Sequence, residues 1–198
     1  MSPRKTEVWQ ALKEKRKEVI FNAGLQLFAR KGFHQTTMEE IAQQVGISKG
    51  LLYNYFSSKD DLLEQIIRRA FKEIDDLFDP NHDGILTVDE FEYFIEAYLK
   101  LLTEKPDYWK LIFYLTLQPG IQSILKKIQA DETTTAIFNI LTQYLERHGF
   151  ANARQETQLL HYIFDGLIWN YIMNPNDVDI ETIKQIILNR YVLPFKEQ

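Results

Sequence analysis

The stretch TTMEEIAQQVGISKGLLYNYF, residues 36–56, decides how this chain folds. Its apolar residues recur every three or four positions in two short runs, and Gly46 turns the chain between them. Ser48 can cap the second run, in which Leu52 and Phe56 form the inward pair. The spacing predicts a helix-turn-helix, whose second helix can enter the major groove of DNA. A helical hairpin of this length can also be plain scaffold, so the spacing alone leaves both interpretations open.

Helical spacing continues along the whole chain, and no run of period two bounded by hairpin turns interrupts it. The chain is therefore predicted to be all-α. A first helix should stop near Gly32, and a fourth should begin near Lys59. Further helices are expected at about 88–103, 106–117, 119–129, 132–148, 153–173 and 179–193, separated by Pro, Gly and Asn residues.

The charge of the chain is unevenly distributed. The 198 residues carry a net charge of −5, but residues 1–59 hold ten Lys/Arg against five Asp/Glu. The remainder holds 13 basic against 23 acidic residues. The basic end is therefore the part to consider for phosphate contacts.

The amino-acid composition limits which reactive groups the protein can use and where in the cell it is expected. The chain has no cysteine, which excludes disulfides, thiolate nucleophiles and Cys-ligated metals. The charged N-terminus lacks the apolar segment of a secretory signal, and no run approaches the roughly 18 apolar residues that span a bilayer. We therefore expect a soluble, cytoplasmic protein with no membrane partner.

The basic end carries a specific family pattern. From Ile20 to Leu63 the sequence closely resembles the N-terminal domain of the tetracycline-repressor (TetR) family, over roughly the first third of the chain. The positions that keep the family spacing are Ala23, Leu27, Phe28, Gly32, Thr36, Thr37, Ile41, Ala42, Gly46, Ser48, Gly50, Tyr53, Phe56, Lys59 and Leu62.

The resemblance implies an architecture and a set of partners. Residues 1–58 would be a three-helix helix-turn-helix DNA-binding domain, and 59–198 a helical effector-binding and dimerisation domain. The last two helices would pair with their copies in a homodimer, which implies a palindromic double-stranded operator. Repression relieved by a small-molecule effector is the commonest arrangement in such a family, but no residue distinguishes a repressor from an activator.

The resemblance also assigns DNA contacts. Thr37, at the start of the second helix, would touch phosphate, and Lys59 would grip the DNA backbone. Asn54 is a plausible reader of adenine. The recognition helix would contribute Ser48, Lys49 and Gly50 at its start and Tyr53, Asn54 and Tyr55 on its groove-facing side.

A second motif, DPNHDGILTVDE at residues 79–90, does not belong to this family pattern. Its spacing is that of an EF-hand loop, which holds Ca²⁺ with oxygen ligands around a sharp glycine turn, here Gly84. The predicted ligands are Asp79, Asn81, Asp83, the Ile85 carbonyl and Glu90, with Thr87 at the ninth position. The alternative is a turn of Pro, Asn, Asp and Gly followed by a Thr87/Glu90 capping box.

The acidic part of the chain is rich in aromatic residues. Aromatics at helical spacing are more often core than pocket, yet polar residues interleave with them as an effector site would require. The candidate pocket residues are Trp109, Phe113, Phe138, His161, Tyr162, Asp165 and Trp169.

Two other function classes can be compared with a DNA-binding regulator. An enzyme is not expected, because the sequence has no G-x-S-x-G elbow, phosphate-binding glycine loop or H-E-x-x-H motif, and its four histidines lack metal spacing. The alternative is a calcium-responsive protein-binding module in which DNA is incidental. The basic first third favours the DNA-binding regulator.

Overall fold

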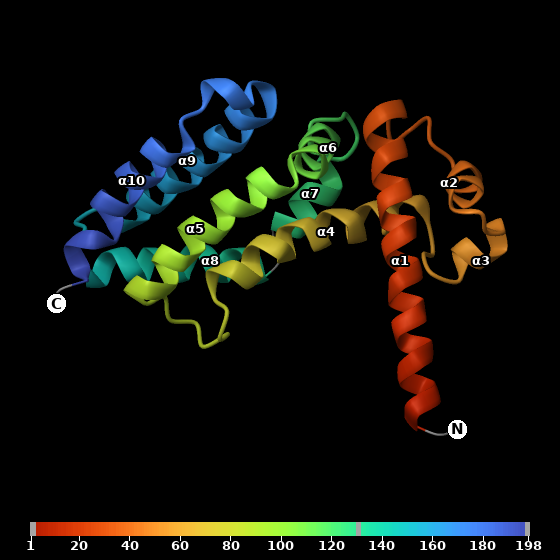
Figure 1. Cartoon of the computed structure of the whole chain (residues 1–198), viewed down its shortest axis with the longest axis horizontal. Coiled ribbons are helices and arrows are strands. Elements are labelled where there is room, and N and C mark those ends of the chain that lie inside the picture. The colour runs from red at the N-terminus through yellow and green to blue at the C-terminus, as the bar shows by residue number, and fades with distance from the viewer. Residues whose placement is uncertain (1–2, 130–131, 197–198) are drawn as a thin grey trace. The chain divides into compact units, whose positions relative to one another are not determined.

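The computed structural model describes residues 3–129 and 132–196, and every regular element in these ranges is helical (Figure 1). This confirms the all-α prediction. The α-helices are α1 (Pro3–Lys31), α2 (Met38–Val45), α3 (Lys49–Tyr53), α4 (Lys59–Phe78), α5 (Val88–Glu104), α6 (Pro106–Thr116), α7 (Gln122–Gln129), α8 (Glu132–Arg147), α9 (Ala153–Met173) and α10 (Ile180–Tyr191). Short 3-10 turns follow at Pro175–Asp177 and Leu193–Phe195. Within the described ranges, no helix combines the length and apolar character needed to cross a membrane.

The chain forms two compact units. The first contains the residues up to Ala70 together with Leu111–Ile124, and the second contains Phe71–Lys110 and the residues from Leu125 onward. Helices α4, α6 and α7 therefore each contribute residues to both units. The predicted boundary after residue 58 separates a DNA-binding from an effector-binding domain. The two units are defined by contacts between residues and do not test that boundary.

The core of the first unit joins α1 to the helix-turn-helix and to the start of α4. Its fully buried side chains include Ile20, Phe28, Ile41, Leu52, Phe56, Leu62 and Leu63. Gly24 of α1 lies against α4, because a Cβ added there would be 3.2 Å from both Leu62 and Ile66. The buried Leu52 and Phe56 confirm the predicted inward pair.

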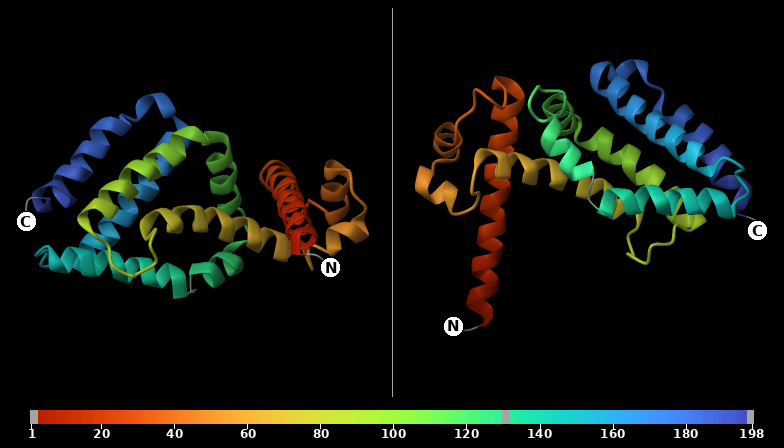
Figure 2. Two further views of the ribbon diagram at one scale, coloured as in Figure 1. Left: turned by 60° about the horizontal axis from the view of Figure 1, so that its bottom comes forward. Right: turned by 180° about the vertical axis from the view of Figure 1, so that it is seen from behind.

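The second unit is built around the helices that follow α4 (Figure 2). Helix α8 packs against α9, and α5 packs against α10. In its core, the rings of Phe91 and Tyr144 meet edge to face with their centroids 5.0 Å apart. The Tyr144 hydroxyl donates a 2.7 Å hydrogen bond to the Tyr191 carbonyl, and burial raises the pKa of Tyr144.

Candidate nucleic-acid interface

Helix α2 is held at both ends by its own sequence. At its start, the Thr37 hydroxyl accepts the Glu40 N–H at 3.2 Å while the Glu40 carboxylate accepts the Thr37 N–H at 2.8 Å. This is a capping box. At its end, Gly46 takes the left-handed conformation with φ 73°, which lets the chain turn into α3. Lys31 also binds Glu40, and the bonds from Lys31 and Thr37 lower the pKa of this carboxyl to about 2.

Helix α3 presents polar residues outward over a buried base. Ser48 caps the helix by accepting the Leu51 N–H at 3.1 Å, as the sequence predicts. Lys49, Gly50, Tyr53 and Asn54 are exposed, whereas Tyr55 is half-buried with its ring 6.5 Å from that of Phe56. No heavy atom lies within 4 Å of a Cβ added at Gly50, so a ligand can approach the backbone there.

One counter-charge lies near this surface. The Lys49 ammonium is 3.5 Å from the Glu39 carboxylate, and both side chains are more than half exposed. An exposed pair of this kind contributes little to stability, on the order of 0.2–1 kcal/mol. Lys49 can therefore exchange Glu39 for a phosphate at small cost.

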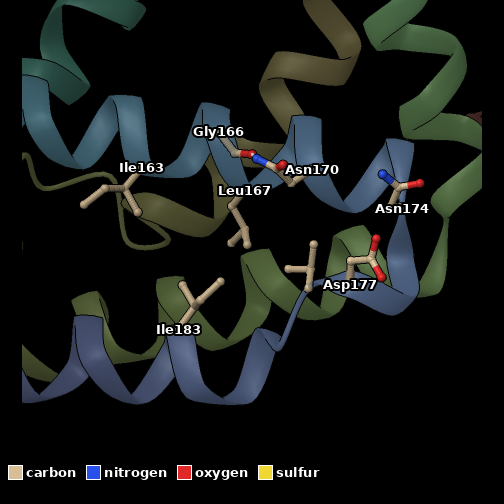
Figure 3. Close-up of a pocket in the computed structure, with 8 residues that line it drawn as sticks. Ile163, Gly166, Leu167, Asn170, Asn174, Asp177 and Ile183 are labelled. Carbon is tan, nitrogen blue, oxygen red and sulfur yellow. The ribbon is translucent and has the colours of Figure 1, made fainter.

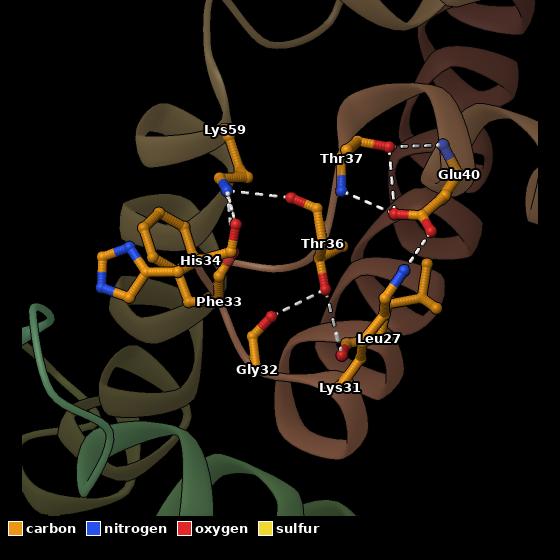
Figure 4. A network of polar contacts seen from close by, with 9 residues as sticks. All are labelled: Leu27, Lys31, Gly32, Phe33, His34, Thr36, Thr37, Glu40 and Lys59. Atoms are coloured by element: carbon orange, nitrogen blue, oxygen red, sulfur yellow. Dashed lines mark hydrogen bonds and ion pairs between the residues drawn. The ribbon is translucent and has the colours of Figure 1, made fainter.

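Lys59 has a different environment from the one its predicted role requires. Its ammonium donates to the carbonyls of Phe33 at 2.8 Å, His34 at 3.2 Å and Thr36 at 2.9 Å (Figure 4). It also lies 4.6 Å from the centroid of the Phe33 ring. A lysine ammonium has three donors, and all three are used by the turn between α1 and α2. The predicted grip of Lys59 on the DNA backbone remains untested, but it would require breaking these bonds.

The same turn is fixed by a residue that the sequence analysis did not single out. Gln118 accepts the Phe33 N–H at 2.8 Å and donates to the Phe28 carbonyl at 2.8 Å. The His34 ring nitrogen Nε2 lies 3.2 Å from the Pro119 carbonyl oxygen. The partners are 85 or 90 residues apart, so neither helical periodicity nor a local motif could have revealed them.

The predicted effector residues have mixed environments. Trp109 is buried, and its indole Nε1 finds no hydrogen-bond partner in the described part of the chain, while Phe113 and Phe138 are half-buried. The four candidates on α9 are exposed: His161, Tyr162, Asp165 and Trp169. The inward face of α9 is instead formed by Thr157, Leu160, Phe164 and Leu167. His161, Tyr162 and Asp165 are therefore exposed, and their assignment to an effector pocket remains a prediction.

A cleft does lie along α9, with other lining residues. It has a volume of about 440 Å³ and runs between α9 and the segment leading into α10 (Figure 3). Its lining residues are Ile163, Gly166, Leu167, Asn170, Asn174, Asp177, Val178 and Ile183. None of these was among the predicted effector residues.

The predicted metal-binding loop connects α4 to α5. Its first residue, Asp79, follows the end of α4, and Glu90 lies in the first turn of α5. In the described part of the chain, no three His, Asp or Glu side chains already surround a common point at which a metal could bind.

Comparison with known proteins agrees with this geometry. Residues 20–66 match the family described as "Bacterial regulatory proteins, tetR family". An uncharacterized HTH-type transcriptional regulator of Haemophilus influenzae is 33% identical over 114 residues, which cover 57% of this chain and 54% of that protein. The biofilm operon negative regulator IcaR of Staphylococcus epidermidis is 25% identical over 130 residues, covering 66% of this chain and 69% of IcaR.

A solved structure extends the likeness beyond the N-terminal region. The transcriptional regulator FadR of Bacillus subtilis, in complex with stearoyl-CoA, has a TM-score of 0.69 and 20% identity. The superposition covers 89% of this chain and 97% of FadR, so the fold is shared along nearly the whole length. Residues 20–66 therefore match the N-terminal domain of the tetR family of bacterial regulatory proteins, and the fold of the chain resembles that of a solved regulator over nearly its whole length.

Proposed function

We propose that the chain is a homodimeric transcriptional regulator that binds a palindromic operator through α3 and releases or engages it in response to a small molecule. The observation that carries this proposal is the two-sided character of α3. Leu52 and Phe56 are buried, while Lys49, Tyr53 and Asn54 are exposed on a rigidly capped helical pair. Such a helix can enter the major groove without disturbing the core beneath it.

The exposed residues divide into two kinds of contact. Thr37, Ser48, Lys49 and the open backbone at Gly50 are suited to phosphate oxygens, which fix the position of the protein on the duplex. Tyr53, Asn54 and Tyr55 are assigned to the base edges, where Asn54 can pair with adenine. The half-buried Tyr55 has the smallest exposed fraction of these three residues and is expected to contribute least.

The dimer is assigned to α9 and α10. Both helices expose large apolar side chains: Leu159, Tyr162, Trp169 and Met173 on α9 and Ile186 on α10. Ile186 is 61% exposed and Tyr162 is 64% exposed, which is unfavourable for such side chains unless another surface covers them. A two-fold interface would cover both copies and place two α3 helices about 34–36 Å apart, one helical turn of DNA.

Control by a small molecule is supported by one buried group and one relative. The Trp109 Nε1–H is a buried donor with no acceptor among residues 3–129 and 132–196, and a ligand acceptor in the second unit would satisfy it. FadR, which shares the fold, was solved with stearoyl-CoA bound. A ligand that prefers the conformation unable to bind DNA must weaken DNA binding by the same factor by which DNA weakens its own binding. IcaR, a negative regulator, favours repression as the mode of control.

The test begins with selection of bound fragments from genomic DNA, followed by fluorescence anisotropy on the selected site. Lys49→Ala should weaken binding and lower the slope of log K against log salt concentration by about 0.9, because one phosphate contact is lost. Lys100→Ala is the matched control, since Lys100 is also exposed and lies 3.7 Å from a glutamate, Glu104, on α5. A monomeric protein, or one without preference among DNA sequences, would refute the proposal.

A further inference from the structure

The loop between α4 and α5 folds back on itself and carries several oxygen-bearing side chains. Two of its residues take the left-handed conformation, His82 with φ 57° and Gly84 with φ 75°. Such values are uncommon outside glycine and let the chain fold back within a few residues. Leu86, which follows this bend, is buried, and its carbonyl accepts a 2.7 Å hydrogen bond from Arg147 of α8. The loop is therefore anchored to the second unit, although its other residues are largely exposed.

The carboxylates in the loop are held by backbone N–H groups. Asp79 Oδ2 accepts the Gly84 N–H at 3.1 Å, and Asp83 Oδ1 accepts the Ile85 N–H at 2.8 Å. In each aspartate, one carboxylate oxygen is therefore held by a backbone N–H, and the other oxygen can bind a different partner. Because Asp79 reaches the bend at Gly84, its carboxylate lies within the loop.

The second oxygen of Asp79 differs from the first. Asp79 Oδ1 is buried, and no donor among the described residues makes a hydrogen bond to it. A buried carboxylate oxygen without a donor is destabilising, and each such atom in a native protein calls for an explanation such as an ion. This atom is also the oxygen of the first position in the EF-hand pattern, where a Ca²⁺ ligand is required.

A nitrogen donor lies between the other two carboxylates. The Asn81 amide nitrogen donates to Asp83 Oδ2 at 3.2 Å and to Glu90 Oε1 at 2.8 Å. Its N–H groups supply partial positive charge between two acidic groups that would otherwise repel each other. A divalent cation would supply much more positive charge to the same oxygens. Ion binding would also require Asn81 to exchange its nitrogen for its oxygen toward the centre.

The simpler explanation of this segment is a capped turn. The Thr87 hydroxyl accepts the Glu90 N–H at 3.2 Å, and Glu90 Oε2 accepts the Thr87 N–H at 2.9 Å. The same capping box exists at Thr37 and Glu40, where no Asp-x-Asn-x-Asp-Gly sequence precedes it. Capping explains the position of one Glu90 oxygen. It does not explain why Asp79 Oδ1 is buried, or why the carboxylates of Asp83 and Glu90 both accept from the Asn81 amide.

We infer that residues Asp79–Glu90 bind one Ca²⁺ ion. The ligands are side-chain oxygens of Asp79, Asn81, Asp83 and Glu90 and the carbonyl of Ile85. Three carboxylates with amide and carbonyl oxygens suit a hard cation of flexible coordination, whereas Mg²⁺ demands a tighter octahedral arrangement. The ion would act as a brace that ties the end of α4 to the first turn of α5. This inference does not depend on DNA binding, so its test and that of the proposed function can fail separately.

The test is calorimetric titration of Ca²⁺ into the full-length protein after chelator treatment and removal of the chelator. One site is expected, with a Kd of about 10⁻⁵ to 10⁻³ M, because a single loop lacks the support of a paired EF-hand. Glu90→Gln removes a charged ligand while its amide oxygen can still accept the Thr87 N–H, and it should weaken Ca²⁺ binding at least tenfold. Asp83→Asn should do the same without touching the capping box.

Glu40→Gln is the matched control, because it makes the same substitution in the capping box of α2 and should leave Ca²⁺ affinity unchanged. Far-UV circular dichroism establishes that each variant is folded before it is titrated. The inference is overturned if the wild-type protein gives no saturable heat up to millimolar Ca²⁺, or if Glu90→Gln and Asp83→Asn both bind as tightly as wild type. Equal affinity for Mg²⁺ would overturn the assignment to Ca²⁺.

Discussion

Replacing Lys59 by methionine separates two roles that this residue can have. Lys59→Met keeps an unbranched side chain of similar length but removes the ammonium that binds three carbonyls of the turn between α1 and α2. If Lys59 positions this turn, the variant should lose stability in the first unit. If Lys59 instead binds phosphate, the main effect should be on the electrostatics of DNA binding.

The expected loss of stability follows from the individual bonds. Hydrogen bonds to charged groups contribute roughly 1.5–3 kcal/mol each. Two of the three bonds are partly buried, to Phe33 at 2.8 Å and to Thr36 at 2.9 Å, whereas the bond to His34 at 3.2 Å is exposed. We take the lower value for each of the two partly buried bonds and allow water to replace part of each. The free energy of unfolding should then fall by about 2–3 kcal/mol.

Hydrogen exchange of the segment 32–46 and urea unfolding measure this loss. Lys72→Met, on the exposed side of the same helix, should change stability by less than about 0.5 kcal/mol. In operator binding, a positioning role predicts weaker affinity with an unchanged salt slope, whereas loss of a phosphate contact lowers the slope by about 0.9. Unchanged exchange together with a lower slope would refute the positioning role.

Two further predictions concern single residues. Gln118→Leu leaves the Phe33 N–H and the Phe28 carbonyl without their side-chain partner, so hydrogen exchange at the end of α1 should report a loss of about 1–3 kcal/mol. The control is Gln44→Leu, since Gln44 is exposed and donates a long, 3.4 Å bond to Gln26; equal losses in both variants would contradict the reasoning. Burial, with a contribution from the charge of Asp76, raises the pKa of Asp75 from 3.8 to about 6. The folded state thus binds this proton more tightly, and the associated stability is full below about pH 4 and is lost as pH rises through 6. Asp75→Asn should remove this decline from the pH dependence of urea unfolding, and an unaltered profile would show that Asp75 is not its source.

Local patterns predicted most of the fold because helices are encoded over a few residues. Ser48, Gly46 and the pair Leu52 and Phe56 were identified from sequence and have the expected roles. The recognition helix ends at Tyr53, before Phe56 of the predicted inward pair, while the helix expected from 119 begins at Gln122. The second difference has a simple cause, because Gly120 takes φ 87° in the turn that precedes this helix.

Long-range contacts were beyond the reach of those patterns. A lysine at the start of a helix carries the same local signal whether it faces solvent, phosphate or backbone carbonyls, so the contacts of Lys59 could not be predicted. Gln118 carries no signal at all, since its partners lie 85 and 90 residues away. For α9, interleaved polar and aromatic residues suggested a pocket, but the buried positions are those of Leu160, Phe164 and Leu167. A helix with apolar residues on several faces does not reveal which face is inward.

The two capping boxes of the chain share a sequence spacing but differ in their electrostatic surroundings. Thr37 with Glu40 and Thr87 with Glu90 have the same spacing and nearly the same hydrogen bonds, so capping alone makes them equivalent. They differ in what surrounds the glutamate. Glu40 binds Lys31, a cation from its own chain, whereas the second oxygen of Glu90 accepts from the neutral amide of Asn81, which also donates to a second carboxylate, that of Asp83. The Lys31 ammonium balances the charge of Glu40 in the first box. Among the described residues no such ion pair is made by Glu90, which is the physical reason to look for an ion there.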